Sequence, residues 1–420
     1  MELEPELELD VTGIAHGGVG VARDADGRVV FVADAIPGER VRAQVTESKK
    51  TFARATATKV LLASPDRVPH VWPEASIDRA PDDRVGGAEF GHIALPRQRA
   101  LKAEVLLDAM RRFGGVDLES RFPGLDPSTL VAAVPGDDAV GGLGWRTRVR
   151  LRVGPDGRAG QYAVRSHRVI PVATLPLAVP VISGVLEQEF AGIDKVDAIA
   201  HGGELRLVIG EQKPTVIEER VGARTFRVDD QGFWQVHRAA PEVLVAAVRD
   251  AIDLERFDPS AANVDLYGGV GLLASALGDL GGPATRIETV ESDARASAHA
   301  AENLAEFENA VATVARVDRW VREAAGPSSR SARSGTGAGT EYAGATIVLD
   351  PPRSGAGNEV TAAIAGLGAA QLIYVACDPV ALARDTKTLE ASGYRLTRLT
   401  AFDLFPHTHH LEAIATFVQA

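Results

Sequence analysis

The second half of the chain alternates short apolar runs with runs of helical spacing, and this order constrains the fold more than any other feature of the sequence. Strand-like and helix-like runs follow one another over residues 263–266, 272–277, 286–290, 294–304, 346–349 and 372–376. Strands that alternate with helices in this way predict a parallel sheet with helices on both faces. The pattern begins near residue 231, and we therefore expect an α/β domain over residues 231–420.

The first 61 residues have a different pattern, in which short strand-like runs are separated by glycine-rich turns. The runs at residues 8–11, 29–32 and 41–45, with the hairpin signal Asp26-Gly27, are typical of a small OB-type β-barrel of five strands. Basic and aromatic side chains lie together near its end, at Lys49, Lys50, Phe52, Arg54 and Lys59. Barrels of this kind bind single-stranded nucleic acid, so residues 1–61 are expected to bind RNA or DNA.

Between these regions the sequence predicts a central α+β domain over residues 62–230. Residues 62–95 are rich in Pro, Asp and Gly and predict a loop, whereas residues 97–113 have the apolar spacing of a helix that Gly114-Gly115 ends. Short strand patterns follow. A separate segment at residues 326–344 is rich in Ser, Gly and Arg, and it predicts a flexible insertion at the surface of the α/β domain.

Composition excludes several classes of protein. No apolar stretch of the chain approaches the roughly 20 residues of a membrane span, and the acidic N-terminus lacks the basic start of a signal peptide. We therefore expect a cytoplasmic protein with no membrane partner, present as a monomer. A single cysteine cannot form an internal disulfide or a cysteine-rich metal site, so no metal is expected.

The formal net charge of -12 argues against indiscriminate binding to nucleic acid but leaves room for a local basic face. Arg146, Arg148, Arg150 and Arg152 alternate along one predicted strand, so their side chains share one side of a sheet. With few acids nearby in the sequence, these arginines are suited to contact RNA phosphates. A solvated strand face is the alternative reading of the same pattern.

Cys377, the only cysteine, follows an apolar run that predicts a buried strand, and Asp378-Pro379 ends that strand. A lone cysteine is most often a small buried hydrophobic residue. Here the thiol is predicted at the carboxyl end of a sheet strand, which is where open α/β sheets bind ligands. Its position therefore makes Cys377 a candidate nucleophile.

A second group of residues follows other predicted strands of the same domain. The turn from Asp265 to Gly271 contains Tyr267, Gly268 and Gly269, and its glycines would let the backbone approach a nucleotide-like ligand. Glu291 ends the next strand, where a carboxylate can bind both hydroxyls of a ribose. The spacing of turn and acid suggests a site for S-adenosylmethionine (SAM). Asp350 ends a third strand and is followed by two prolines and Arg353.

Three motifs in the C-terminal half make the chain resemble a known family. They are Asp350-Pro351-Pro352-Arg353, then Cys377-Asp378-Pro379 with Ala383-Arg384-Asp385, and finally Phe405-Pro406-His407-Thr408-x-His410-x-Glu412. In this order they resemble the SAM-dependent RNA 5-methyluridine methyltransferases, which methylate C5 of uracil in tRNA and 23S rRNA. The resemblance covers most of the chain, and the N-terminal unit is similar to the TRAM domain of that family.

The resemblance implies a multidomain fold and a division of roles among the site residues. It implies an OB-type TRAM barrel, a central α+β domain and a Rossmann-like SAM methyltransferase domain. Cys377 would be the nucleophile that adds to C6 of uracil, and Glu412 the base that removes the C5 proton. Arg353 would help to hold the target nucleotide, which must be flipped out to be reached. SAM would be contacted by Gln235, Tyr267, Gly269, Glu291 and Asp350, and Asp350 could instead touch the target base.

The sequence departs from the family pattern at three places. Many relatives bind an iron–sulfur cluster through cysteines around a Cys-Gly-Gly-Cys-x-x-Gln-His segment, whereas this chain has residues 85–92 as Val-Gly-Gly-Ala-Glu-Phe-Gly-His, so no such cluster is expected. Asp378 replaces the usual Asn, and its charge should raise the pKa of the thiol. His237 and Leu272 stand where relatives have Asn.

Two other classes of function remain open on the sequence alone. An amino-methyltransferase that acts on adenine or on a protein nitrogen would share the SAM turn, but it would place an aromatic residue after the two prolines, where this chain has Arg353. A catalytically inactive RNA-binding relative would be expected to lack Cys377 or Glu412, and both are present. Formation of a covalent adduct with RNA that contains 5-fluorouridine would separate these classes.

Overall fold

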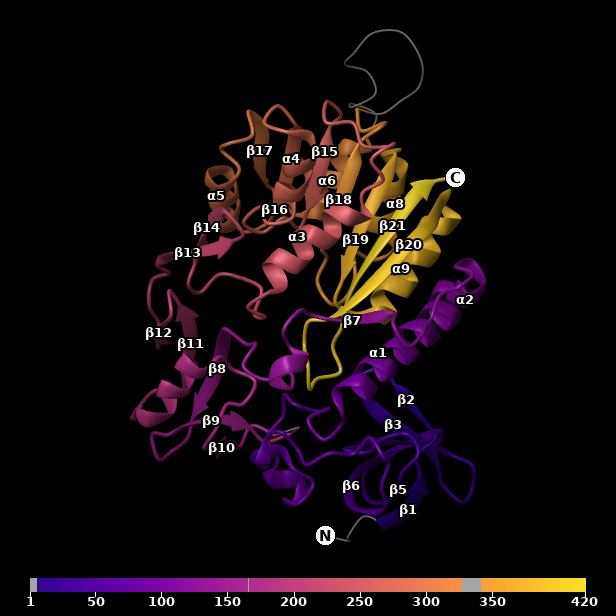
Figure 1. Ribbon diagram of the computed structural model, residues 1–420, viewed down its shortest axis with the longest axis vertical. Helices are drawn as coiled ribbons and strands as arrows, with labels where there is room; N and C mark the ends of the chain where they lie inside the picture. Colours follow the sequence, from indigo (N-terminus) through magenta and orange to yellow (C-terminus); the bar gives the residue numbers. More distant parts are fainter. Residues whose placement is uncertain (1–5, 165, 327–340) are drawn as a thin grey trace. The chain divides into compact units, whose positions relative to one another are not determined.

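The computed structural model describes residues 6–164, 166–326 and 341–420 (Figure 1). The insertion expected at residues 326–344 lies largely outside the described residues. The chain divides into two compact units, each built from segments that are far apart in the sequence. The first unit comprises Met1–Val105, Pro127–Gln212 and Asp403–His410, and the second comprises Leu106–Asp126, Lys213–Phe402 and Leu411–Ala420.

The N-terminal part of the first unit is a mostly antiparallel sheet. Its strands are β1 (Glu6–Asp10), β2 (Gly13–Ala15), β3 (Val19–Arg23), β4 (Val29–Ala33), β5 (Arg40–Ser48) and β6 (Phe52–Leu62), in the spatial order β1-β5-β6-β4-β3-β2. The hairpin predicted at Asp26-Gly27 is confirmed, because Gly27 has φ 81° and its N–H donates to the Asp24 carbonyl. The described residues give six strands, not the five expected, because Gly17 and Gly18, both with positive φ, add the hairpin β2–β3.

The rest of the first unit contains a second antiparallel sheet and the start of a long helix. The sheet has the order β10-β9-β8-β11-β12. Its strands are β8 (Arg148–Val153), β9 (Ala159–Tyr162), β10 (Val169–Pro171), β11 (Lys195–His201) and β12 (Glu204–Ile209), and β7 (Val131–Ala133) precedes them. Short 3-10 turns lie at Pro73–Ala75, Pro81–Asp83, Asp138–Val140 and Pro180–Glu187.

The helix predicted at residues 97–113 is confirmed as α1 (Leu95–Ala109), which continues into a π-helical turn at Met110–Gly114. Gly115 ends it in the left-handed conformation with φ 69°, as the glycine pair predicted. The short helix α2 (Leu118–Arg121) follows in the second unit, with the Asp117 side chain accepting two backbone hydrogen bonds at its N-terminus.

The second unit contains the α/β sheet that the alternation predicted. Its strands are β15 (Asn263–Leu266), β16 (Arg286–Glu291), β17 (Asn309–Val314), β18 (Thr346–Leu349), β19 (Gln371–Ala376), β20 (Tyr394–Asp403) and β21 (Glu412–Gln419). Its helices are α3 (Ala240–Ala251), α4 (Ala274–Gly281), α5 (Ala294–Asn303), α6 (Val317–Ala324), α8 (Asn358–Gly366) and α9 (Pro379–Ala391), and the hairpin β13 (Val216–Val221) and β14 (Arg224–Asp229) precedes them (Figure 1).

Strand order explains why the functional groups gather at one edge of this sheet. The order runs β17-β16-β15-β18-β19-β21-β20, with the first five strands parallel and β21 antiparallel to both β19 and β20. Every residue of β15, β18 and β19 is buried, as expected for central strands covered on both faces. Their carboxyl ends therefore point to the same edge. Within the described residues, no helix has the length and apolar character needed to cross a membrane.

Candidate active site

Three parallel strands bring the predicted site residues to one edge of the sheet. Leu266 of β15 pairs with Leu349 of β18, and Leu349 pairs in turn with Tyr374 of β19. The residues that follow these strands are Tyr267, Asp350 and Cys377. Because an open α/β sheet binds ligands beyond the carboxyl ends of its strands, this edge is the candidate active site.

A pocket lies at the end of β15 and has an empty volume of about 420 Å³ that is partly open to solvent. It brings together Gln235, Tyr267, Gly269 and Asp350, which are four of the five residues predicted to contact SAM. Its remaining lining residues are Phe233, Trp234, Asp265, Gly268, Val270, Leu272 and Leu273. The mixture of aromatic, apolar and carboxyl groups is typical of a small-molecule site.

The turn after β15 is held tightly against the sheet. Tyr267 has φ 63°, which non-glycine residues seldom adopt. A Cβ on Gly268 would lie 1.9 Å from Oγ1 of Thr289, so only glycine fits there. The fifth predicted SAM residue, Glu291, accepts a hydrogen bond from the Gly269 N–H at 3.1 Å and thereby fixes the turn from the neighbouring strand. Glu291 and the turn that contains Gly269, both predicted to contact SAM, therefore lie in direct contact.

Two carboxyl groups line the pocket, and sequence reasoning had assigned only one of them. Asp350 is half-buried, and loss of solvent around its carboxyl group raises its pKa to about 7. Asp265 is completely buried, and burial together with the charge of Asp350 raises its pKa well above its usual range. Its Oδ2 accepts from the Ala274 N–H at 2.9 Å, while its Oδ1 is buried without a hydrogen-bond partner. The sequence feature that could have identified Asp265 is an acidic residue inside an otherwise apolar strand.

When ionised, these carboxyl groups would favour a cationic ligand. A buried carboxylate next to another is costly unless a positive charge compensates it. SAM carries a sulfonium and an ammonium group, so it fits this donor set better than a neutral nucleoside does. The pocket residues are therefore compatible with the cofactor that the sequence predicted.

Cys377 and Glu412 come together because β21 runs antiparallel to β19. Ala376 pairs with Ala413, and the same register places Cys377 opposite Glu412, one residue further on. Glu412 is buried, and burial together with the charge of Asp350 raises its pKa well above its usual range. Burial, followed by the charges of Glu412 and Asp350, raises the pKa of the Cys377 thiol to about 12. The thiol, the base and Asp350 thus form one electrostatic group.

Arg353 and Asp378 act on the same thiol with opposite signs. Arg353 is exposed, and its charge lowers the pKa of Cys377, whereas the charge of Asp378 raises it. The expected direction of the Asp378 effect is confirmed, although burial is the larger cause. Asp378 also begins α9, because its Oδ1 accepts from the N–H groups of Val380 and Ala381. This helix-capping role explains why a short hydrogen-bond acceptor stands after the cysteine.

Asp385 holds the loop that follows Asp350, a role that sequence reasoning missed. Its buried Oδ2 accepts from the Tyr374 hydroxyl at 2.6 Å and from the Ala356 N–H at 2.8 Å. A Cβ on Gly355 would lie 2.8 Å from the same oxygen. The third residue of the Ala383-Arg384-Asp385 motif therefore fixes the backbone that carries Arg353. His237, another departure from the family, is buried, and its Nδ1 accepts from the Ala239 N–H.

The basic surfaces of the first unit agree only partly with prediction. Arg148, Arg150 and Arg152 alternate with buried residues of β8, as predicted, but Arg146 precedes the strand in an isolated bridge. The expectation of few nearby acids is wrong for Arg150, because Asp197 on β11 lies directly opposite and forms an ion pair with it at 2.6 Å. In the N-terminal sheet, Glu47 forms ion pairs with Lys49 and Arg54.

The segment that matches the cysteine frame of relatives does not fit an iron–sulfur cluster. Val85 and Ala88 occupy the cysteine positions, and both side chains are buried. Val85 forms an isolated antiparallel bridge with Ala163, which is also buried and apolar. The one thiol of the chain, Cys377, follows β19 in the other unit. These side chains have no donor atoms for iron.

Comparison with known proteins assigns the chain to a family. A family model described as tRNA (Uracil-5-)-methyltransferase matches residues 261–419, and a TRAM domain model matches residues 5–58. An uncharacterized RNA methyltransferase of Streptomyces avermitilis is 38% identical over 98% of this chain and 97% of its own length. A 23S rRNA (uracil(1939)-C(5))-methyltransferase RlmD of Halomonas elongata is 30% identical over 98% of this chain and 89% of its own length.

A solved structure shares the fold. The Pyrococcus abyssi tRNA (uracil-54, C5)-methyltransferase, in complex with S-adenosyl-L-homocysteine, aligns with a TM-score of 0.67 at 19% identity and covers 98% of this chain and 99% of its own. This likeness supports the methyltransferase fold, and the full-length relatives establish the kinship. The chain therefore belongs to the tRNA (uracil-5-)-methyltransferase family of SAM-dependent RNA methyltransferases and carries an N-terminal TRAM domain.

Proposed function

We propose that this protein transfers a methyl group from SAM to C5 of a specific uridine in structured RNA, with Cys377 as nucleophile and Glu412 as base. The observation that carries this proposal is the register of β19 and β21, which sets the chain's only thiol opposite a buried carboxyl group. Methylation at C5 through a C6 adduct requires a nucleophile for C6 and a base for the C5 proton. The adjoining pocket supports SAM as the methyl donor.

The chemistry follows from the weak nucleophilicity of uracil C5. The Cys377 sulfur adds to C6, and the electron pair that moves to C5 and O4 makes C5 nucleophilic. SAM would supply the electrophilic methyl group that C5 accepts, and its sulfur would keep the electron pair of the broken S–CH3 bond and leave as S-adenosylhomocysteine. Glu412 then takes the C5 proton, the C5–C6 double bond forms again, and the Cys377 thiolate leaves. Burial favours the protonated thiol at neutral pH. The thiol must therefore lose its proton before the sulfur can add to C6.

The remaining site residues take supporting roles in this proposal. Gln235, Tyr267, Gly269 and Glu291 hold the nucleoside part of SAM, and Asp350 lies between the pocket and the thiol as a counter-charge for the cationic donor. Arg353 is exposed beside the thiol and holds the target nucleotide. In functional terms we divide the chain into an RNA-binding TRAM domain (residues 1–61), a central domain (62–230) and a catalytic domain (231–420).

The RNA target is proposed from the relatives. One is named for 23S rRNA and the solved structure for tRNA, so both RNA classes are candidates for this chain. Methylation mapping of total RNA from a strain that lacks the gene would identify the uridine. A missing methyl group in 23S rRNA alone, or in tRNA alone, would decide between the two classes.

The mechanism is tested with RNA that contains 5-fluorouridine. In 5-fluorouridine, fluorine replaces the hydrogen at C5, so the base has no proton to remove and the Cys377–C6 bond cannot be released. The enzyme should therefore migrate as a protein–RNA adduct on a denaturing gel. Cys377→Ser should form no adduct and transfer no methyl group, while it retains SAM binding. Substantial turnover by Cys377→Ser with tritiated SAM would rule out the assigned nucleophile.

Glu412→Gln provides the complementary test. It should form the C6 bond to unmodified RNA and methylate C5, but it should release product slowly, so that the adduct accumulates. Glu255→Gln, an exposed change in the same unit, is the matched control and should turn over like the wild type. An amino-methyltransferase would form no adduct in any variant, and its product would carry the methyl group on nitrogen.

A further inference from the structure

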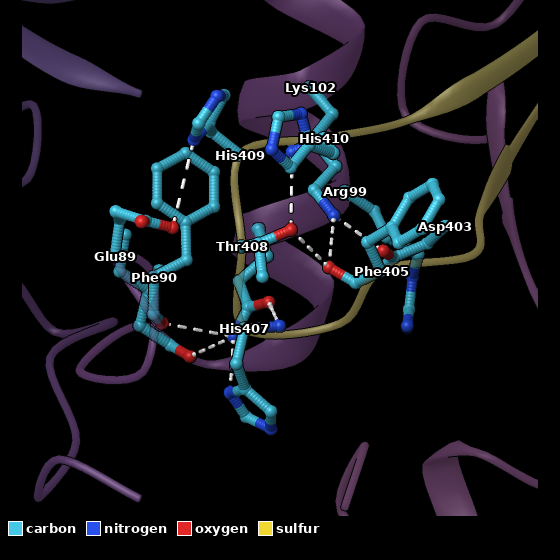
Figure 2. A network of polar contacts seen from close by, with 12 residues as sticks. Glu89, Phe90, Arg99, Lys102, Asp403, Phe405, His407, Thr408, His409 and His410 are labelled. Carbon is cyan, nitrogen blue, oxygen red and sulfur yellow. Dashed lines mark hydrogen bonds and ion pairs between the residues drawn. The ribbon is translucent and has the colours of Figure 1, made fainter. Parts of the chain in front are cut away.

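The loop Asp403–His410 joins β20 to β21, and its last residue precedes Glu412 by two positions. Although its two ends continue into the second unit, the loop itself belongs to the first unit. There, three separate segments of the first unit approach it: the glycine turn between β2 and β3, the Glu89–Phe90 segment and helix α1. Figure 2 shows the last two of these segments beside the loop. The proposed function leaves these contacts unexplained.

Gln98 on α1 is the centre of the polar contacts. Its side chain is completely buried, and its Oε1 accepts from the His407 N–H at 2.7 Å. Its Nε2 lies 3.1 Å from the Phe90 carbonyl, 2.8 Å from the Ile93 carbonyl and 3.0 Å from Nδ1 of His407, and its two hydrogens are shared among these three acceptors. One amide side chain thus connects the loop and helix α1 with the carbonyls of Phe90 and Ile93.

His407 is held in a single, strained conformation. It has φ 65°, and its own carbonyl accepts from the Phe90 N–H at 2.9 Å. Its Nε2 must donate to the Gly141 carbonyl at 2.8 Å, because a carbonyl can only accept. Nδ1 is then the acceptor for Gln98, which fixes a neutral ring. Burial lowers the pKa of His407, in agreement with this state. A backbone held against strain in this way indicates a functional constraint.

A buried ion pair holds the other end of the loop. Lys102, one helical turn after Gln98, donates to Oδ1 of Asp403 at 2.5 Å and to the Phe405 carbonyl at 3.1 Å, and both charged side chains are buried. Within the loop, Oγ1 of Thr408 donates to the Phe405 carbonyl at 2.8 Å and accepts from the His410 N–H at 3.3 Å. The backbone on both sides of His407 is therefore fixed (Figure 2).

The N-terminal sheet approaches the same loop at Gly18. A Cβ on Gly18, which has φ 73°, would lie 2.6 Å from Cβ of His409 and 2.8 Å from the Phe90 ring. Gly17, the preceding residue, also has a positive φ of 86° but has nothing within 4 Å of its Cβ position. Of these two glycines, only Gly18 lies close to the loop.

We propose that Gly18, Gln98 and Thr408 are positioning residues for the removal of the C5 proton. They hold the loop Asp403–His410, and the held loop sets where the Glu412 carboxylate lies when the methylated uracil is bound to Cys377. In the step they serve, the C5–H bond breaks, the proton goes to Glu412, the electron pair forms the C5–C6 double bond, and the Cys377 sulfur leaves as thiolate. The inference rests on the role proposed above for Glu412.

The test compares Gly18→Ala with Gly17→Ala in the full-length protein. Both variants put an alanine at a positive φ, but only Gly18→Ala pushes on His409. RNA that carries tritium at C5 of uridine reports proton removal as tritium released to water, and a denaturing gel reports the adduct. Gly18→Ala should release tritium about 10- to 100-fold more slowly than Gly17→Ala. SAM binding and adduct formation should be unchanged, so the adduct accumulates.

Equal rates of tritium release for the two alanine variants would overturn the proposal. Failure of the wild type to form an adduct with 5-fluorouridine RNA would overturn it together with the proposed function, whereas the equal-rate result removes the positioning role alone. The two failures are therefore distinguishable.

Thr408 provides a second, milder test in case Gly18→Ala does not fold. Thr408→Val keeps the shape of the side chain but removes both hydrogen bonds of Oγ1, and Thr408→Ser restores them. We expect Thr408→Val to accumulate the adduct and to release tritium slowly. Thr408→Ser should show the wild-type ratio of adduct to released product. A merely structural role would lower the melting temperature of Thr408→Val without changing the ratio of adduct to released product, and that result would also refute the proposal.

Discussion

Alkylation of Cys377 tests the electrostatics of the site directly, because the chain has only one thiol. Burial and the charges of Glu412 and Asp350 raise the pKa of Cys377 from 9.0 to about 12. Iodoacetamide reacts with the thiolate, so the native protein should react slowly. The same protein unfolded in urea, where the thiol regains an ordinary pKa, provides an internal reference.

The expected rate follows from this shift in two steps. At pH 8 a rise of three pKa units lowers the thiolate fraction by about 1000-fold. A thiolate of higher pKa is intrinsically more nucleophilic, by about 15- to 30-fold for three units at a Brønsted slope of 0.4–0.5. Native Cys377 should therefore react about 30- to 60-fold more slowly than the unfolded chain.

Glu412→Gln isolates the contribution of the base. Removing its carboxylate should lower the pKa of Cys377, and each unit of decrease should raise the alkylation rate by about 3- to 4-fold. The difference in alkylation rate between Glu412→Gln and the wild type should increase as the pH rises and Glu412 ionises. Rates are followed by mass spectrometry from pH 7 to 10, with Glu255→Gln as the control. A Glu412→Gln variant that reacts at the wild-type rate across this range would refute the coupling of the two groups.

Four further outcomes are expected. Because burial raises the pKa of Asp350 to about 7 and a cationic ligand favours its ionised form, SAM affinity measured by calorimetry should rise with pH below 7 and level off above it, and Asp350→Asn should remove this dependence. Lys102→Met should cost about 3–5 kcal/mol in urea unfolding by leaving Asp403 buried and unpaired, and replacing Asp403 by Leu as well should recover most of the loss. Lys50→Gln should flatten the salt dependence of RNA binding by about 0.7–0.9 log units per log unit of salt, whereas Arg150→Gln should change it less because Asp197 already neutralises Arg150. The purified protein should contain no iron by elemental analysis.

Local patterns predicted much of the fold. The order of the α/β elements, the helix that became α1 and the turn at Gly27 all follow from rules that act over a few residues, and the structure confirms them. The extra hairpin β2–β3 was missed because a three-residue strand carries too little periodicity to recognise. The antiparallel direction of β21 was not predicted either, because the direction of a strand depends on the path of the chain.

The site was harder to derive because its partners are distant in the sequence. Motifs identified Cys377 and Glu412, but only the register of two strands explains why they oppose each other. Lys102 and Asp403 lie 301 positions apart, and nothing near either residue indicates its partner. In the predicted helix, Lys102 reads as an ordinary surface lysine, and only the three-dimensional contact accounts for its burial.

The division of the first unit among three stretches of sequence has a consequence for how the protein is made. Residues 403–410 are synthesised long after the helix that carries Gln98 and Lys102. This helix therefore emerges from the ribosome before its hydrogen-bond partners in residues 403–410 have been made. Domains ordinarily complete their folding in order from the N-terminus during synthesis. Here the first unit is finished only when residues 403–410 have been synthesised. A prematurely terminated chain would expose an amide and an ammonium group without their partners and would be open to proteolysis. Completion of the first unit is thereby tied to synthesis of the segment that directly precedes Glu412.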